Sequence, residues 1–319
     1  MLLSLGEVAR KLRIQYPGAL YHVINRGNYQ RAVFETAGAA LAFEAAVAEA
    51  CERHRWRVHA YTSLPNHFHF ALETPDANLV DGMHWLQSTF ATRFNRFRAQ
   101  RGHLFQGRYQ ALIVEDAAAL LRVVNYINLN PVRAGLVESA GVGSYRWGSL
   151  RHFVQGVRAP WLVGDVILGA LGLEDLPTGW ASYVGYLTTL ASDSELQQRQ
   201  GFDEMCRGWA IGTLSWRREL ARQYAHLALH PGYEADELRE IKESRWRAAL
   251  ERAVSMRGLS LTEILKDASA DTAPWKIEVA VQLRREVAAP YAWIADALKI
   301  RNSASLRMQV HRLTLHVSA

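Results

Sequence analysis

Cysteine is scarce in this sequence, which has only Cys51 and Cys206 among 319 residues. Two thiols so far apart argue against a disulfide framework and against a cysteine metal site. Such scarcity is typical of proteins that work in a reducing compartment, and we therefore predict a cytoplasmic location.

Long apolar runs are also missing, and no stretch has the length needed to cross a bilayer. Residues 1–13 mix Glu7, Arg10 and Lys11 with apolar residues and lack a small-residue cleavage pattern, so we expect no signal peptide. With 49% hydrophobic and 21% charged residues, the composition is that of a folded globular chain, long enough for two domains. The net charge of +6 mildly favours a polyanionic partner.

Acidic residues are absent between Gly82 and Val114, where arginines are frequent. The arginines of this segment are Arg93, Arg96, Arg98, Arg101 and Arg108. The aromatic or imidazole side chains interleaved with them are Phe94, Phe97, His103, Phe105 and Tyr109. A basic segment without compensating acids suits a phosphate backbone, and aromatic rings beside it suit unstacked bases. The alternative is an ordinary solvated helix face.

Two histidines separated by one residue occur in the run Leu64–Phe70. With a period of two, His67 and His69 share one face of a strand, while Phe68 and Phe70 share the other and can be buried. Two neighbouring imidazoles on a strand supply half of a divalent-metal site. The same pair would also fit a half-exposed sheet that binds no metal.

Apolar periodicity predicts an α+β fold in the first part of the chain. Strands are expected at Leu20–Arg26, Trp56–Thr62, in the histidine run and at Tyr109–Glu115, and helices at Thr36–His54, Leu79–Arg98 and Ala117–Leu129. The order strand–helix–strand–strand–helix–strand predicts a ferredoxin-like antiparallel sheet with helices on one face. Asp116 is the expected N-cap of the third helix, which we expect to end at Asn130-Pro131.

Tyr126 and Asn130 lie four residues apart in the third predicted helix and therefore project from the same side of it. Each residue also has an ordinary structural explanation. Tyr126 fits a half-buried core tyrosine, and Asn130 fits a polar helix end before a proline.

The second half of the chain differs in character. Residues 151–200 show no strong period and are predicted to be a connecting region with short helices, and residues 201–319 a mainly helical domain. Within 290–313, a short apolar-faced helix is followed by Asn302 or Ser303 as the cap of a helix that carries Arg307. This pattern predicts a helix-turn-helix, although any two amphipathic helices joined by a short turn look similar.

Four segments, in this order, resemble the REP-associated tyrosine transposases, relatives of the single-tyrosine insertion-sequence transposases in the HUH nuclease superfamily. The segments are Tyr21–Asn28, Leu64–His69, Phe105–Tyr109 and Tyr126–Val137. The resemblance covers roughly residues 16–150, and it implies a catalytic HUH domain at 1–150. The C-terminal half lies outside this common core and resembles the helix-turn-helix appendage of some longer members.

The resemblance assigns His67 and His69 to the family's metal-binding pair, Tyr126 to its nucleophile and Asn130 to an amide-type metal ligand. Phe68 is larger than the aliphatic residue usual between the two histidines, but it is still apolar. The family implies a metal-dependent nuclease and strand transferase that cleaves palindromic hairpins of single-stranded DNA. Attack by the tyrosine would leave a 5′-phosphotyrosine and a free 3′-hydroxyl.

Two imidazoles and one amide oxygen suit Mg²⁺ or Mn²⁺. The arginines expected to contact DNA are Arg26, Arg93, Arg96, Arg98, Arg101, Arg108, Arg133 and Arg307. Duplex DNA is a further expected partner, through the C-terminal domain. Two alternatives stay open: a non-catalytic DNA-binding regulatory protein on the same scaffold, and RNA as the ligand. The sequence leaves open the oligomeric state, and whether Tyr126 serves the metal site of its own chain.

Overall fold

The computed structural model describes residues 14–224, 239–259 and 273–316, so residues 1–13, where we expect no signal peptide, lie outside it. The chain forms two compact units, Arg13–Leu214 and a second built mainly from Ser215–Ala319. The positions of the two units relative to one another are not determined. None of the described helices is long and apolar enough to span a membrane.

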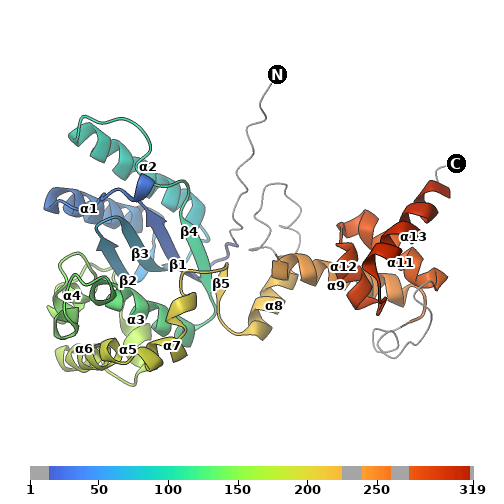
Figure 1. Ribbon diagram of the computed structural model, residues 1–319. Coiled ribbons are helices and arrows are strands. Elements are labelled where there is room, and N and C mark those ends of the chain that lie inside the picture. Colours follow the sequence, from blue (N-terminus) through green and yellow to red (C-terminus); the bar gives the residue numbers. More distant parts are fainter. Residues whose placement is uncertain (1–13, 225–238, 260–272, 317–319) are drawn as a thin grey trace. The chain divides into compact units, whose positions relative to one another are not determined.

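The first unit is built on a sheet with the strand order β2-β3-β1-β4-β5 (Figure 1). Its strands are β1 (Ala19–Arg26), β2 (Arg57–Leu64), β3 (His67–Thr74), β4 (Gln110–Val114) and β5 (Ala210–Ile211). Among the first four, each strand is antiparallel to its neighbours, which confirms the ferredoxin-like arrangement. The short β5 joins the edge of β4 in parallel and makes the sheet mixed, a pairing that was not predicted.

One face of the sheet is covered by α1 (Ala37–His54) and α2 (Leu79–Phe97), which pack against each other (Figure 1). Phe68 and Phe70 of β3 point to this side and contact Phe43 of α1 at ring-centroid distances of 5.0 and 6.0 Å. The core of this layer is therefore aromatic. The prediction that the phenylalanines of the histidine strand face the interior is confirmed.

The opposite face is covered by α3 (Ala117–Arg133), which packs against β2 and β3. Helices therefore cover both faces of the sheet, whereas we expected them on one. The N-cap prediction is confirmed, because Asp116 Oδ1 accepts a hydrogen bond of 2.8 Å from the Ala119 amide. The predicted end at Asn130-Pro131 is wrong. Pro131 lies inside the helix and is buried, and packing at this site offsets its missing N–H.

The residues that follow α3, up to Leu214, belong to the same compact unit as the sheet. They form η2 (Ser139–Ser144), α4 (Leu150–Val154), α5 (Asp165–Ala170), α6 (Pro177–Ser192), α7 (Ser194–Arg199) and η3 (Phe202–Glu204). Helices α5 and α6 pack against α3. Backbone hydrogen bonds join β2 to residues 147–163, for example from the Ser63 amide to Trp147 O at 2.8 Å, so this segment covers the outer edge of β2.

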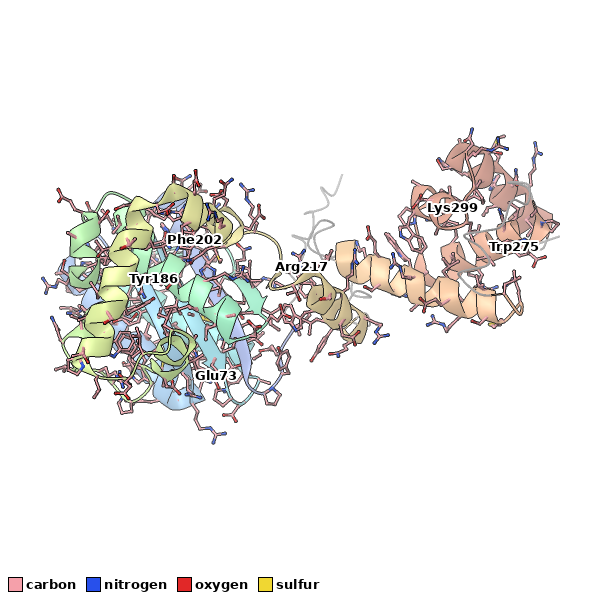
Figure 2. The ribbon with its side chains drawn as sticks, turned by 90° about the horizontal axis from the view of Figure 1, so that it is seen from below. Glu73, Tyr186, Phe202, Arg217, Trp275 and Lys299 are labelled. Atoms are coloured by element: carbon pink, nitrogen blue, oxygen red, sulfur yellow. The ribbon has the colours of Figure 1, made fainter. Side chains whose placement is uncertain are left out.

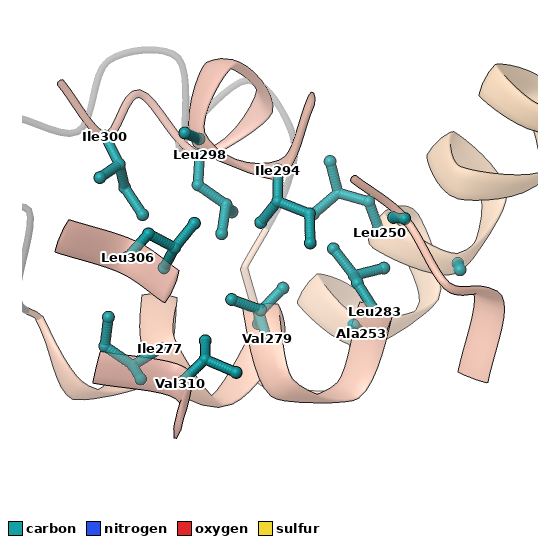
Figure 3. Packing of buried hydrophobic residues seen from close by; sticks show 14 of the residues in the cluster. Leu250, Ala253, Ile277, Val279, Leu283, Ile294, Leu298, Ile300, Leu306 and Val310 are labelled. Atoms are coloured by element: carbon teal, nitrogen blue, oxygen red, sulfur yellow. The ribbon is translucent and has the colours of Figure 1, made fainter. Parts of the chain in front are cut away.

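The second unit has an apolar core of its own, shown in Figure 3. Its described helices are α9 (Arg239–Ser255), α11 (Pro274–Val287), α12 (Tyr291–Ala297) and α13 (Ser303–His316), and α8 (Leu214–Gln223) begins at the boundary of the two units. Leu283 of α11, Ile294 of α12 and Leu306 of α13 are almost fully buried. The predicted cap of the last helix is confirmed, since Asn302 Oδ1 accepts hydrogen bonds from the amides of Ala304 and Ser305.

Candidate active site

The two strand histidines lie on the sheet face that α3 covers. Across the β1–β3 pairing, His67 stands opposite Arg26 and His69 opposite Ile24. Directly opposed residues in antiparallel strands project from the same face. The ring centroids of His67 and His69 are 5.0 Å apart, with His69 buried and His67 partly exposed at the sheet end.

Tyr126 of helix α3 lies beside these histidines. Its ring centroid lies 5.7 Å from that of His69, and its side chain is only 9% exposed. Asn130, one turn further on, is buried as well, and its side-chain amide lowers the pKa of the Tyr126 phenol. The structure thus brings the four residues selected from the sequence, His67, His69, Tyr126 and Asn130, to one place.

A third histidine, which sequence reasoning missed, completes this cluster. His22 of β1 is fully buried, and its Nε2 lies 3.0 Å from Nδ1 of His69. Its Nδ1 lies 2.8 Å from the carbonyl oxygen of Met205. His22 alternates with Arg26 on the predicted strand and so shares its face, but the sequence did not show which residue of β3 would stand beside it.

The segment that follows α7 closes over the tyrosine. The hydroxyl of Tyr126 is 3.1 Å from Cys206 Sγ, and the ring of Phe202 meets the phenol edge-on at a centroid distance of 5.5 Å. Phe202 is labelled in Figure 2. The Arg133 guanidinium lies 5.1 Å from the centroid of the Tyr126 ring. No sequence pattern links Cys206 to Tyr126, which lies far before it in the chain.

Burial sets the protonation of these groups. It lowers the pKa of His22 to about 4 and that of His67 to about 4, and it also lowers the pKa of His69. Neighbouring positive charge, from Arg26 for His67, acts in the same direction. Burial raises the pKa of Tyr126, an effect that Arg133 and Asn130 oppose. Near neutral pH the imidazoles are therefore uncharged and the phenol is protonated.

These lowered pKa values predict a loss of stability in acid. His22 is neutral in the folded protein down to about pH 4, whereas the unfolded chain takes up a proton near its ordinary pKa of about 6.5. The unfolded state therefore binds more protons between these values, and stability falls as the pH is lowered through this window. His22 alone contributes a loss of about 2 kcal/mol between pH 7 and pH 5.

The measurement is the free energy of unfolding of the first unit, read from hydrogen exchange of β1 and β3 peptides in increasing urea, at pH 7 and pH 5 for the wild type and the His22→Gln variant. The variant should lose less stability between the two pH values. The control is His84→Gln on the exposed surface of α2, which should match the wild type. Equal losses in all three proteins would contradict the neutral, buried state of His22.

A buried polar network holds α3 in place on the side that faces α6. The Tyr183 hydroxyl of α6 donates to Asn125 Oδ1 at 2.9 Å and accepts from Asn128 Nδ2 at 3.2 Å. Asn125 also donates to Gln200 Oε1, and Gln200 in turn donates to the Tyr186 hydroxyl at 2.7 Å. Tyr186 is labelled in Figure 2. Because these bonds attach the side of α3 that faces α6, they help to set the rotation that directs Tyr126 to the histidines.

The predicted DNA-contacting arginines do not form one cluster. Arg26 is exposed opposite His67, and the loop that carries Arg101 and Arg108 is joined to the same strand end, where the Gln106 amide donates to Arg26 O at 2.8 Å. Arg93 of α2 instead pairs through both terminal nitrogens with Glu49 of α1. The two remaining α2-end arginines, Arg96 and Arg98, are exposed, and Arg307 lies in the second unit.

The aromatic residues between these arginines divide in the same way. Phe94 of α2 and Phe105 and Tyr109 of the following loop are buried and belong to the core. Phe97 is 82% exposed. Tyr29 in η1 (Asn28–Gln30), which was not predicted, is 93% exposed. Exposed rings available to stack on bases are therefore fewer than the sequence indicated, and one comes from another segment.

The donor set fits a divalent cation only when the asparagine is included. No group of three or more His, Cys, Asp or Glu side chains in the described ranges could hold a metal ion. Nε2 of His69 is buried and has no hydrogen-bond partner among the described residues, which is an arrangement expected of a ligand atom. Two imidazole nitrogens and the Asn130 amide oxygen are suitable ligands for Mn²⁺ or Mg²⁺.

Comparisons with known proteins find a transposase family in the first part of the chain. Residues 15–130 match the family described as "Transposase IS200 like". A protein of Haemophilus influenzae named "Putative REP-associated tyrosine transposase" is 26% identical over 107 residues. The match covers 30% of this chain and 61% of that protein, so the chain spans less than two thirds of the relative's length.

Among solved structures, one described as "Structure of the REP associates tyrosine transposase bound to a REP hairpin" is similar over 50% of this chain and 93% of that chain. The TM-score is 0.40 and the sequence identity is 18%. The resemblance seen in the sequence is confirmed: residues 15–130 carry the signature of the IS200-like transposases, and a REP-associated tyrosine transposase is among the relatives that the chain matches.

Proposed function

We propose that the protein is a metal-dependent nuclease and strand transferase that acts on single-stranded DNA folded into hairpins. The observation that carries the proposal is the position of the Tyr126 phenol beside the two strand histidines. The ring centroid of Tyr126 lies 5.7 Å from that of His69, which shares its face of the sheet with His67. A nucleophile beside a pair of neutral imidazoles suits phosphodiester cleavage. The name of the matched relative, a REP-associated tyrosine transposase, supports the choice of a DNA strand-transfer reaction.

In the proposed reaction, the Tyr126 oxygen attacks the phosphorus of a phosphodiester. A bond forms between this oxygen and phosphorus, and the bond from phosphorus to the 3′ oxygen breaks. The phenol gives up its proton and the departing 3′ oxygen takes one, so that no net proton is consumed. The products are a 5′-phosphotyrosine and a 3′-hydroxyl, and attack of a 3′-hydroxyl on the phosphotyrosine would rejoin a strand.

His67, His69 and Asn130 would hold the cation. When bound, a divalent ion would neutralise charge on the phosphate and favour the ionised phenol, as metal ions do in phosphoryl transfer. The chain itself also helps the phenol to lose its proton. Arg133 lies over the ring of Tyr126. Both Arg133 and the Asn130 amide lower the pKa of the Tyr126 phenol, so they act against the effect of burial.

For the substrate, we propose that Arg26, Arg101 and Arg108 bind the DNA backbone at the end of β1. All three are exposed, and the loop carrying the last two is hydrogen-bonded to that strand end. Positive charge at this strand end, where Arg26 stands opposite His67, suits a phosphate that enters the site from this side. The exposed rings of Tyr29 and Phe97 are the candidates for stacking on unpaired bases.

We expect His69→Ala to weaken Mn²⁺ binding strongly and to abolish the covalent adduct with a labelled hairpin. The substitution removes one of two imidazole ligands, so Mn²⁺ affinity should fall by about 100-fold or more. Affinity is measured by electron paramagnetic resonance of free Mn²⁺, and the adduct by denaturing gel electrophoresis. The matched control is His152→Ala, in α4 and away from the site, which should behave like the wild type. Unchanged Mn²⁺ binding by the His69 variant would refute the proposed metal site.

For the C-terminal unit, we propose that α12 and α13 form a helix-turn-helix that binds duplex DNA. The supporting observation is the short turn between them, with Lys299 at a φ of 57° and the Asn302 cap at the start of α13. Leu306 and Val310 anchor one side of α13 in the core, while Arg307 is exposed on the other. A helix held in this way can present side chains to a major groove.

Replacing Arg307 with alanine should weaken duplex binding by about 1–3 kcal/mol if the side chain contacts a base, or roughly 5- to 150-fold in Kd. Fluorescence anisotropy with the full-length protein gives the affinity. Arg285→Ala, which removes an exposed arginine from α11 of the same unit, is the control for general charge. Equal losses in the two variants would reduce the effect to nonspecific electrostatics.

A further inference from the structure

His22 contacts a proposed metal ligand directly but is not itself placed to be one. Both of its ring nitrogens are engaged, Nδ1 with Met205 O at 2.8 Å and Nε2 with His69 Nδ1 at 3.0 Å. We propose that His22 and the Met205 carbonyl form a hydrogen-bond relay that holds His69 in the tautomer with Nδ1 protonated and Nε2 free to bind metal. The inference rests on the proposed function, since it takes His69 to be a ligand.

The direction of each hydrogen bond in the relay follows from its last acceptor, the carbonyl oxygen of Met205. A carbonyl oxygen can only accept, so His22 Nδ1 must carry the proton that it donates to Met205 O. In a neutral imidazole the other nitrogen then has a lone pair, and His22 Nε2 accepts from His69 Nδ1. His69 Nε2 is left unprotonated. This is the nitrogen that is buried without a partner among the described residues.

His67 reaches the same tautomer through a different partner. Its Nδ1 lies 2.7 Å from Asn66 Oδ1. The orientation of the Asn66 amide is set by its nitrogen, which donates to Gln30 O at 3.4 Å. His67 therefore donates from Nδ1 and keeps Nε2 free. Both strand imidazoles therefore have Nε2 free to bind a metal ion. Each ring is oriented by a hydrogen bond from its Nδ1, as is usual for metal-ligating histidines.

The end of the relay lies outside the residues that match the transposase family, which stop at 130. Met205 is buried directly after η3, and the next residue, Cys206, accepts a hydrogen bond from Gln110 Nε2 of β4 through its carbonyl oxygen. The segment is thus fixed to the sheet beside the site. It supplies a part of the site, as a support for His22.

The test measures the tautomers and the metal affinity separately, in the full-length protein. Nitrogen-15 NMR of the metal-free protein should show His69 and His67 protonated at Nδ1. In His22→Phe, His69 loses its acceptor, so its Nε2-protonated form should become populated and affinity for Mn²⁺ alone should fall by about 10- to 100-fold. His22→Gln can still offer an oxygen to His69, so the affinity should recover to within a few-fold of the wild type.

The outcomes distinguish this inference from the proposed function. If His69→Ala leaves Mn²⁺ binding unchanged, the proposed metal site is wrong. If His69→Ala weakens binding strongly but His22→Phe leaves both the His69 tautomer and the affinity unchanged, only the relay is overturned. A wild-type spectrum with His69 protonated at Nε2 would overturn the relay without any variant. Fold integrity of each variant is checked by hydrogen exchange of the β1 and β3 amides.

Discussion

Tyr126→Phe should lower formation of the covalent protein–DNA adduct by about four orders of magnitude or more, while hairpin affinity stays within about twofold of the wild type. The substitution removes only the oxygen that is proposed to attack the phosphodiester. The ring, with its edge contacts to His69 and Phe202, keeps its place in the core. The adduct is measured on a denaturing gel with an end-labelled hairpin and Mn²⁺, and the affinity without metal by fluorescence anisotropy.

Tyr145→Phe is the matched control, because it removes a phenol oxygen that donates to Ser63 O outside the site. This variant should form the adduct like the wild type. An adduct formed by Tyr126→Phe at the wild-type rate would show that another residue is the nucleophile. If the wild type binds hairpins but forms no adduct under any metal condition, the non-catalytic regulatory alternative would be favoured.

Phe43→Ala should lower the free energy of unfolding of the first unit by about 3–5 kcal/mol. Phe43 is 1% exposed, and its ring is surrounded by other rings of the same layer. These are Phe34, Phe68, Phe70 and Phe90, at centroid distances between 4.8 and 6.0 Å. Removing the ring leaves a cavity under the histidine strand, which the neighbouring side chains can fill only in part.

Because the chain has two compact units, the measurement must report on the first one. Hydrogen exchange of β1 and β3 peptides in increasing urea, read by mass spectrometry, meets this need. Leu41→Ala is the control, since this residue of the same helix is 50% exposed, and it should change stability by less than about 0.5 kcal/mol. A loss below about 1 kcal/mol for Phe43→Ala would contradict the packing of this layer.

The sequence predicted those parts of the fold that depend on local pattern. The alternation in the histidine strand indicated its two faces, and the helical spacing of Tyr126 and Asn130 placed both side chains on one side of α3. The same local reasoning predicted the wrong end for α3. Proline usually breaks a helix, but Pro131 is buried in a continuous helix, where tertiary packing outweighs the local penalty.

What the sequence did not predict depends on contacts between distant residues. The pairing of His22 with His69 requires the strand register, and the contact of Cys206 with Tyr126 joins residues 80 positions apart. The ion pair of Arg93 with Glu49 also joins separate helices, so an arginine in an acid-free segment still has a carboxylate partner. Periodicity carries no information on such contacts. The charge of one segment also does not show whether a residue of a different segment neutralises it.

The position of α3 between two layers has a consequence for how the site is assembled. One side of the helix packs against β2 and β3 and the other against α5 and α6, and residues 123–131 are all buried. For Tyr126 to reach the histidines of a second molecule, the helix would have to separate from both layers and expose these residues to water. The Tyr126 phenol and the histidines beside it therefore lie on the same polypeptide, and a single chain carries all the residues proposed for the site.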